Sequence, residues 1–183
     1  MENMEKIENS TKKLELINQW ISNCDTKSSF ILTFYGVVLT IIFTSTIGGE
    51  MINSFSFRKS NEFNLENIIN FILLLNTIAF FITSTVTLYN IYSTLKGRID
   101  ATVYNQNGLK TESNIFFGSI ASKTFENFEN ELNSENETSY LNDLNSQIFI
   151  NANIVNEKFK YYNKSLIWMF ISLGIFILFV IIK

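Results

Sequence analysis

The sequence of 183 residues contains no histidine and one cysteine, Cys24. These absences exclude histidine-based catalytic triads, Cys-His pairs and zinc sites built from cysteine and histidine. The seven glycines never form GxGxxG or GxxxxGK[ST], so neither common nucleotide-binding loop is present. We therefore expect no catalytic residues, no metal site and no cofactor, and a protein that is not an enzyme.

Proline is also absent, although average usage of about 5% predicts roughly nine in this length, and long unbroken helices are therefore favoured. Charges are missing from three long stretches, residues 28–49, 67–95 and 165–182. A bilayer core needs about 20 apolar residues, so the pattern predicts an all-α membrane protein with three transmembrane helices. We expect the first span to end at Gly48-Gly49, residues 50–66 to form a short external loop, and the end of the second span to project as a stalk.

Residues 1–27 are polar but show helical periodicity, with apolar residues at Met4, Ile7, Leu14, Ile17, Ile21 and Cys24. This spacing predicts an amphipathic helix. Because the first apolar run begins only at Ser28, behind this helix, we expect an uncleaved anchor rather than a secretory signal.

Residues 96–164 form the main soluble segment. One short amphipathic helix is marked by Ile120, Thr124, Phe125, Phe128 and Leu132. The sequence from Ser134 to Glu137 has the S-x-x-E form of a capping box and predicts the start of a second helix. Its apolar face consists of Leu141, Leu144, Ile148, Val155, Phe159 and Tyr162, and it continues without a breaker into the third span. We expect about 45 helical residues there, and a cytoplasmic helical bundle formed with the N-terminal helix.

Basic residues predict the orientation. Eleven lie in residues 1–27 and 96–164, whereas the other side has only Arg58, Lys59 and Lys183. The positive-inside rule then places the N-terminus and the 96–164 segment in the cytoplasm and the C-terminus outside. Both cytoplasmic segments are nonetheless net negative, which argues against a general nucleic-acid binder.

Two short motifs are candidate binding sites. Asp25 and Lys27 form a charge pair where the N-terminal helix enters the membrane; alternatively, Lys27 snorkels to lipid headgroups and Asp25 caps or pairs locally. Phe116 and Phe117 precede Gly118 and Ser119, so they can stack a base while a helix N-terminus offers N–H groups to a phosphate. The alternative for this second motif is a hydrophobic staple with Ser119 as N-cap.

Two wider patterns add candidates. A collar of basic residues near the cytoplasmic membrane surface can serve topology and anionic lipid, or a small anionic ligand; its members are Lys27, Lys96, Arg98, Lys158, Lys160 and Lys164. Each of the first two spans carries a polar stripe. The stripe of the first span consists of Thr33, Gly36, Thr40 and Thr44, and that of the second consists of Asn76, Thr83, Thr87 and Asn90. Such stripes usually join helices, and a water-lined path is the alternative, so the second stripe supplies membrane-gating candidates.

Four features follow one another along the chain: the amphipathic helix, Asp-x-Lys at the first span, Phe-Phe-Gly-x-Ile-Ala, and a long helix that carries Asp143-Leu144-Asn145-Ser146-Gln147-Ile148 and Lys158 before the last span. The order of these parts resembles the transmembrane effector family of bacterial Pycsar antiphage systems. The family pattern falls on Asp25, Lys27, Phe117, Gly118, Ile120, Asp143, Gln147 and Lys158. Two places depart from it: Ser119 stands where an acid is common, and Cys24 and Ser28 stand where alanine is common.

The resemblance implies a multi-pass protein of the bacterial cytoplasmic membrane. It implies activation by a cyclic nucleotide, such as cCMP or cUMP, from a partner cyclase during phage infection, followed by membrane impairment and abortive infection. The ligand-binding candidates are Asp25, Lys27, Phe117, Gly118, Gln147 and Lys158. We expect the lipid bilayer and further copies of the chain as partners. The alternative function is a non-catalytic three-span anchor whose cytoplasmic rod recruits another protein.

Overall fold

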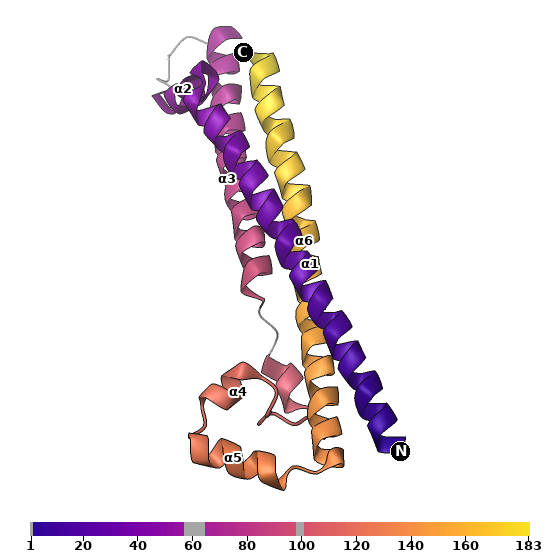
Figure 1. Ribbon diagram of the computed structural model, residues 1–183. Helices are drawn as coiled ribbons and strands as arrows, with labels where there is room; N and C mark the ends of the chain where they lie inside the picture. The colour runs from indigo at the N-terminus through magenta and orange to yellow at the C-terminus, as the bar shows by residue number, and fades with distance from the viewer. Residues whose placement is uncertain (1, 57–64, 98–100) are drawn as a thin grey trace. The chain divides into compact units, whose positions relative to one another are not determined.

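A computed structural model describes residues 2–56, 65–97 and 101–183 (Figure 1). Every regular element in these ranges is a helix: α1 (Glu2–Thr44), α2 (Thr46–Asn53), the 3-10 turn η1 (Ser54–Ser56), α3 (Leu65–Lys96), the 3-10 turn η2 (Ala101–Asn105), α4 (Phe117–Ala121), α5 (Phe125–Ser134) and α6 (Glu137–Ile182). Three of them, α1, α3 and α6, are long and apolar enough to cross a membrane. The predicted all-α membrane fold with three spans is confirmed.

The chain divides into two compact units. The head unit comprises Met1–Asp25 and Gly97–Phe159, and the membrane unit comprises Thr26–Lys96 and Lys160–Lys183. Both α1 and α6 are single helices that contribute to both units. The 46 residues of α6 agree with the long helix expected from a sequence without proline.

The membrane unit packs α1, α3 and α6 side by side around two clusters of buried side chains (Figure 1). One cluster consists of Ile31, Tyr35, Ile91 and Met169. The other consists of Ile42, Met51, Phe80 and Phe179, and therefore includes α2. Each cluster draws on α1, α3 and α6, so the three spans share one interior.

The first span ends differently from our prediction. The break lies at Ser45, whose side chain caps α2 by accepting a hydrogen bond from the N–H of Gly48. Gly48 and Gly49 lie inside α2, where Gly48 packs directly against the backbone of Ile42. A hydroxyl that satisfies a free helix N–H favours a new helix start more than the glycines favour a break. Part of the expected external loop is thus helical, while residues 57–64, including Arg58 and Lys59, lie outside the described residues.

In the head unit, the first part of α1 lies along the first part of α6. Leu14 and Cys24 of α1 are buried, as the periodicity predicts, whereas Met4 is 69% exposed and does not belong to the core face. On α6, Leu144 and Ile150 are buried together with four polar residues, Asp143, Ser146, Gln147 and Lys158. The head unit therefore buries an unusual amount of polar surface along α6.

Figure 1 shows α4 and α5 as consecutive short helices in the connection that leads to α6. The single helix predicted across Ile120 to Leu132 is wrong, because Thr124 caps α5 through the N–H of Asn127 and separates it from α4. The predicted capping box is also wrong in its cap. Ser134 is the last residue of α5 and donates to the Glu131 carbonyl, whereas the Asn136 side chain accepts from the N–H of Ser139 at the start of α6.

Candidate functional site

The head unit contains a buried ion pair between distant parts of the sequence. Lys158 of α6 is only 5% exposed, and its Nζ donates to Asp25 Oδ1 of α1 over 2.5 Å. The side chain of Asp25 is 40% exposed, so water reaches one edge of the pair. A buried ammonium needs such a partner, because a charge stranded in protein is strongly unfavourable.

The turn residue Gly97, which belongs to the head unit, contacts the same lysine. Gly97 has a φ of +57°, which side-chain-bearing residues rarely adopt. A Cβ at this position would lie 2.7 Å from Lys158 Cε, so a side chain here would strain the turn and displace the end of the lysine. We call Asp25, Gly97 and Lys158 the latch. Asp25 is the last residue of the first head-unit segment, and Gly97 is the first residue of the second. Lys158 is the last but one residue of that second segment.

Further contacts pair α1 with α6 in the head unit, on the N-terminal side of the latch. Ser10 donates to Asn145 over 3.1 Å, and Asn151 donates to Asn18 over 2.9 Å. The rings of Trp20 and Phe159 meet edge to face at 6.1 Å. Within the head unit, the latch is thus one of several contacts that pair these two helices.

A second buried group, Asp143, fixes the loop before α4. It is fully buried, and its Oδ2 accepts a 2.7 Å hydrogen bond from the Asn114 N–H. Lys110 Nζ lies 3.6 Å from the same oxygen, and the Lys110 N–H donates to Ser146 Oγ over 2.9 Å. Asp143 Oδ1 is buried and has no hydrogen-bond partner within the described part of the chain.

The loop borders an open, polar pocket of about 440 Å³. Lys110 pairs there with Glu135 at 3.0 Å, and Asn114 accepts a 2.7 Å hydrogen bond from Lys123, which also pairs with Glu131. Glu112, Glu131 and Glu135 line the pocket with Lys110 as the lining cation. The surplus of carboxylates makes this pocket unfavourable for an anion.

The aromatic motif lies at the start of α4. Phe117 is 78% exposed, and its ring lies 4.7 Å from that of Phe116. Gly118 passes so close to the Phe116 ring that a Cβ would come within 2.6 Å. The predicted N-cap is wrong: Phe116 occupies that position without a side-chain cap, and Ser119 lies inside the helix. The N–H groups of Ile115 and Phe116 are instead satisfied by the buried Ser113 hydroxyl.

The six ligand-binding candidates are distributed over several places. The structure joins Asp25 to Lys158, whereas Phe117 and Gly118 belong to α4 and Gln147 is buried on α6, one turn after Asp143. Lys27 belongs to the membrane unit. Because residues two apart do not share a helix face, Asp25 and Lys27 point to different faces of α1. Lys158 differs from an exposed collar member, because its side chain is only 5% exposed and its ammonium pairs with Asp25. Arg98, another collar member, lies outside the described residues.

Two other collar members lie against tyrosines. Lys96 Nζ donates to the Tyr92 hydroxyl over 3.2 Å, and Lys164 Nζ lies 5.5 Å from the Tyr161 ring centroid. Cations in such positions cover aromatic surface while the charge stays accessible.

The polar stripe of α3 points into the membrane unit. Thr83, Thr87 and Asn90 are buried, and each donates to a carbonyl of its own helix. Asn76 is half-buried, and its Oδ1 has no hydrogen-bond partner among the residues that the structure describes. The stripe therefore lines the shared interior of the three spans. On α1, by contrast, Thr33, Thr40 and Thr44 are exposed.

The polar centre of the membrane unit is not predicted by the sequence patterns. Tyr35 of α1 is fully buried, and its hydroxyl lies 2.8 Å from Ser84 Oγ of α3 and 2.7 Å from Ser172 Oγ of α6. One side chain thus links all three spans. A lone tyrosine inside an apolar run carries no periodic signal, but its hydroxyl must find a partner when buried in hydrocarbon.

Comparison with known proteins gives one clear family. The profile of the Pycsar effector protein domain matches residues 9–183. The Pycsar effector protein GmPycTM of Gulbenkiania mobilis is 37% identical, and the aligned region covers 93% of this chain and 89% of that protein. No solved structure matches.

Proposed function

The chain belongs to the Pycsar effector family of bacterial antiphage defence, and from this premise we propose that it is a membrane effector switched on by a cyclic nucleotide. In this proposal a partner cyclase supplies a cyclic pyrimidine nucleotide such as cCMP or cUMP. The effector then impairs the membrane and halts the infected cell, without catalysis. It lies in the bacterial cytoplasmic membrane, with its N-terminus and residues 96–164 in the cytoplasm.

The observation that carries this proposal is the continuity of α1 and α6. Each helix is unbroken from the head unit into the membrane unit. Shifts of whole helices are a common way to transmit a binding event. A ligand that changes how α1 and α6 pair in the head unit therefore has a direct route to the spans.

We propose the exposed edge of the latch as the place where the cyclic phosphate acts. An anion that reaches Lys158 competes with the Asp25 carboxylate for the same ammonium. The acidic pocket beside Lys110 is a poorer place for a phosphate. Replacement of Asp25 by the ligand would release α1 from α6 at the end of the head unit.

Phe117 is the proposed stacking surface for the base, since its ring is the more exposed of the aromatic pair and base stacking contributes about 1–3 kcal/mol. Gln147 is an alternative contact because a buried amide offers both a donor and an acceptor. Gln147 precedes Lys158 by about 16 Å along α6, and Asp143, which holds the loop before Phe117, precedes it by about 22 Å. We therefore propose Phe117 and Gln147 as contacts of a binding position separate from the latch. Variants of Phe117 and of Lys158 distinguish the two positions.

For the membrane step, we propose that activation changes the packing of the α3 stripe. If Asn76, Thr83, Thr87 and Asn90 gate permeability, Asn76→Leu with Thr83→Leu should suppress depolarisation while insertion and ligand binding persist. Thr85→Leu is the matched control, because Thr85 is exposed on the same helix. If the double variant only lowers yield or melting temperature, the stripe serves packing alone.

We also propose that activated copies of the chain associate. The exposed face of α1 supports this, since small residues let helices approach closely in a membrane and nothing lies within 4 Å of the position that a Cβ would take at Gly36. Cross-linking in cells with and without the partner cyclase should show larger species only with the cyclase. An unchanged cross-linking pattern would remove association from the mechanism.

Calorimetry of the purified full chain in detergent tests the sensing step. We expect heat with cCMP or cUMP and little with cyclic purine nucleotides. Phe117→Ala should abolish that heat, whereas Phe125→Ala should retain it, because Phe125 is a matched phenylalanine with 76% exposure. No heat with any cyclic nucleotide would favour the anchor function instead.

A further inference from the structure

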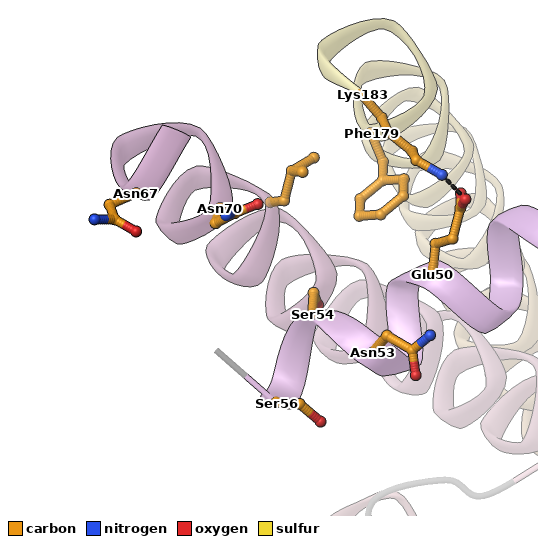
Figure 2. A pocket seen from close by; sticks show the side chains of 9 residues that line it. Glu50, Asn53, Ser54, Ser56, Asn67, Asn70, Phe179 and Lys183 are labelled. Carbon is orange, nitrogen blue, oxygen red and sulfur yellow. Dashed lines mark ion pairs between the residues drawn. The ribbon is translucent and has the colours of Figure 1, made fainter. Parts of the chain in front are cut away.

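The membrane unit contains a second pocket, far from the latch in sequence. Its volume is about 400 Å³, and α2, η1, the start of α3 and the end of α6 surround it. Figure 2 shows the lining side chains from these elements. The lining includes Glu50, Asn53, Ser54, Asn70, Phe179 and Lys183.

The sequence places this pocket at the edge of the bilayer core. Glu50 directly follows the first charge-free stretch, and Lys183 directly follows the third. The second stretch begins at Asn67, which also lines the pocket. Corresponding ends of all three apolar stretches therefore meet here. Phospholipid headgroups occupy this depth in a membrane.

The pocket offers charges of both signs over an apolar floor. The Glu50 carboxylate and the Lys183 ammonium form an ion pair, drawn as a dashed line in Figure 2, and each side chain is 39% exposed. The amides of Asn53 and Asn70 and the Ser54 hydroxyl add neutral hydrogen-bonding groups. Phe179 is almost fully buried and closes the apolar side.

We propose that this pocket binds a phospholipid headgroup in which a primary ammonium follows the phosphate, as in phosphatidylethanolamine. Lys183 would receive the phosphate, and Glu50 would receive the ammonium. Exposed ion pairs are weak, so the protein pair can open to admit a headgroup that offers both opposite charges. This site is independent of the proposed nucleotide response.

The same chemistry distinguishes related lipids. A primary ammonium donates three hydrogen bonds, whereas the trimethylammonium of phosphatidylcholine has no N–H to donate to Glu50. Phosphatidylglycerol carries no cation, so its phosphate would leave the carboxylate unpaired and repelled. The pocket therefore favours the ethanolamine headgroup over both.

Native mass spectrometry of the full chain tests this proposal with three lipids of identical acyl chains. We expect phosphatidylethanolamine adducts to be retained about tenfold more than phosphatidylcholine or phosphatidylglycerol adducts, as the loss of one charge-assisted hydrogen bond would give. Glu50→Gln combined with Lys183→Gln should remove this preference without changing the net charge. Glu8→Gln combined with Lys12→Gln is the matched control, because it removes an exposed ion pair of the head unit.

A second variant guards against loss of folding in the first. Asn70→Leu replaces a hydrogen-bonding group of the pocket wall by an apolar side chain that a membrane tolerates, and it leaves the Glu50–Lys183 ion pair intact. It should therefore weaken the preference for phosphatidylethanolamine, while the helical circular dichroism spectrum stays unchanged. Equal retention of the three lipids, or a preference that survives both pocket variants, would overturn the proposal. Displacement of the lipid by an equimolar amount of soluble phosphoethanolamine would identify a free solute rather than a lipid as the ligand, and would also overturn it.

Discussion

The two partners of the latch should respond very differently to truncation. Asp25→Ala leaves the Lys158 ammonium buried, at 5% exposure, without its carboxylate. Lys158→Met replaces the ammonium by an apolar side chain of similar length. The aspartate that remains in that variant has a 40% exposed side chain, and water can solvate it.

The expected magnitudes follow from this difference in burial. A buried charge without its partner costs about 3–5 kcal/mol, and we expect about 3 kcal/mol for Asp25→Ala because some water reaches the pair. Lys158→Met strands no buried charge, because water can solvate the Asp25 that remains, so we expect a cost of only about 0–1 kcal/mol, as for exposed pairs. The double variant should behave like Lys158→Met alone, since no ammonium is left to strand.

Trp20 gives a local assay, because it packs on Phe159 inside the head unit. With Trp168→Phe as background, its fluorescence reports unfolding of this unit by urea in mild detergent. For an m-value of about 1.5 kcal/mol/M, Asp25→Ala should lower the urea midpoint by about 2 M, and Lys158→Met by less than about 0.7 M. Equal shifts for the two variants, or a neutral Asp25→Ala, would refute the reasoning about the buried ammonium.

Three further results are expected. Asp143→Leu should speed hydrogen exchange across residues 109–117, because the Asn114 N–H loses a buried acceptor worth about 1–3 kcal/mol; unchanged exchange would contradict this anchoring. Tyr35→Phe should lower the melting temperature of the detergent-solubilised chain by an amount equivalent to about 0.6–2 kcal/mol, since its hydroxyl contacts both neighbouring spans. The hydrogen bond and charge of Lys12 lower the pKa of Glu8. The stabilisation of α1 by this ion pair is therefore present above the ordinary glutamate pKa, and it is lost as the pH falls through the lowered pKa of Glu8. An NMR titration should show this lowered pKa, and Lys12→Gln should raise it.

The sequence predicts the spans well because their signal is local. Three charge-free stretches and the absence of proline determine α1, α3 and α6. Helix starts are less predictable, since several side chains compete to cap the same N–H groups. Asn136 caps α6 although Ser134 has the better motif, and Ser45 ends the first span before the glycine pair does.

The candidate site is only partly predictable. Asp25 and Lys158 are separated by 133 residues in the sequence, and only the paired helices reveal that the lysine is buried. A lysine beside an apolar run normally predicts snorkelling to the membrane surface. The resemblance to the family identifies Asp143, but no residue pattern indicates that its carboxylate holds the loop at Asn114.

Dye release from proteoliposomes containing only the purified chain tests the central proposal most directly. The account predicts release when cCMP or cUMP is added, little release with cyclic purine nucleotides, and no response to cCMP or cUMP from Phe117→Ala. It also predicts a full response from Phe125→Ala. Liposomes that stay intact with every cyclic nucleotide, although the protein is folded and inserted, would contradict the claim that this chain is itself the nucleotide-gated membrane effector.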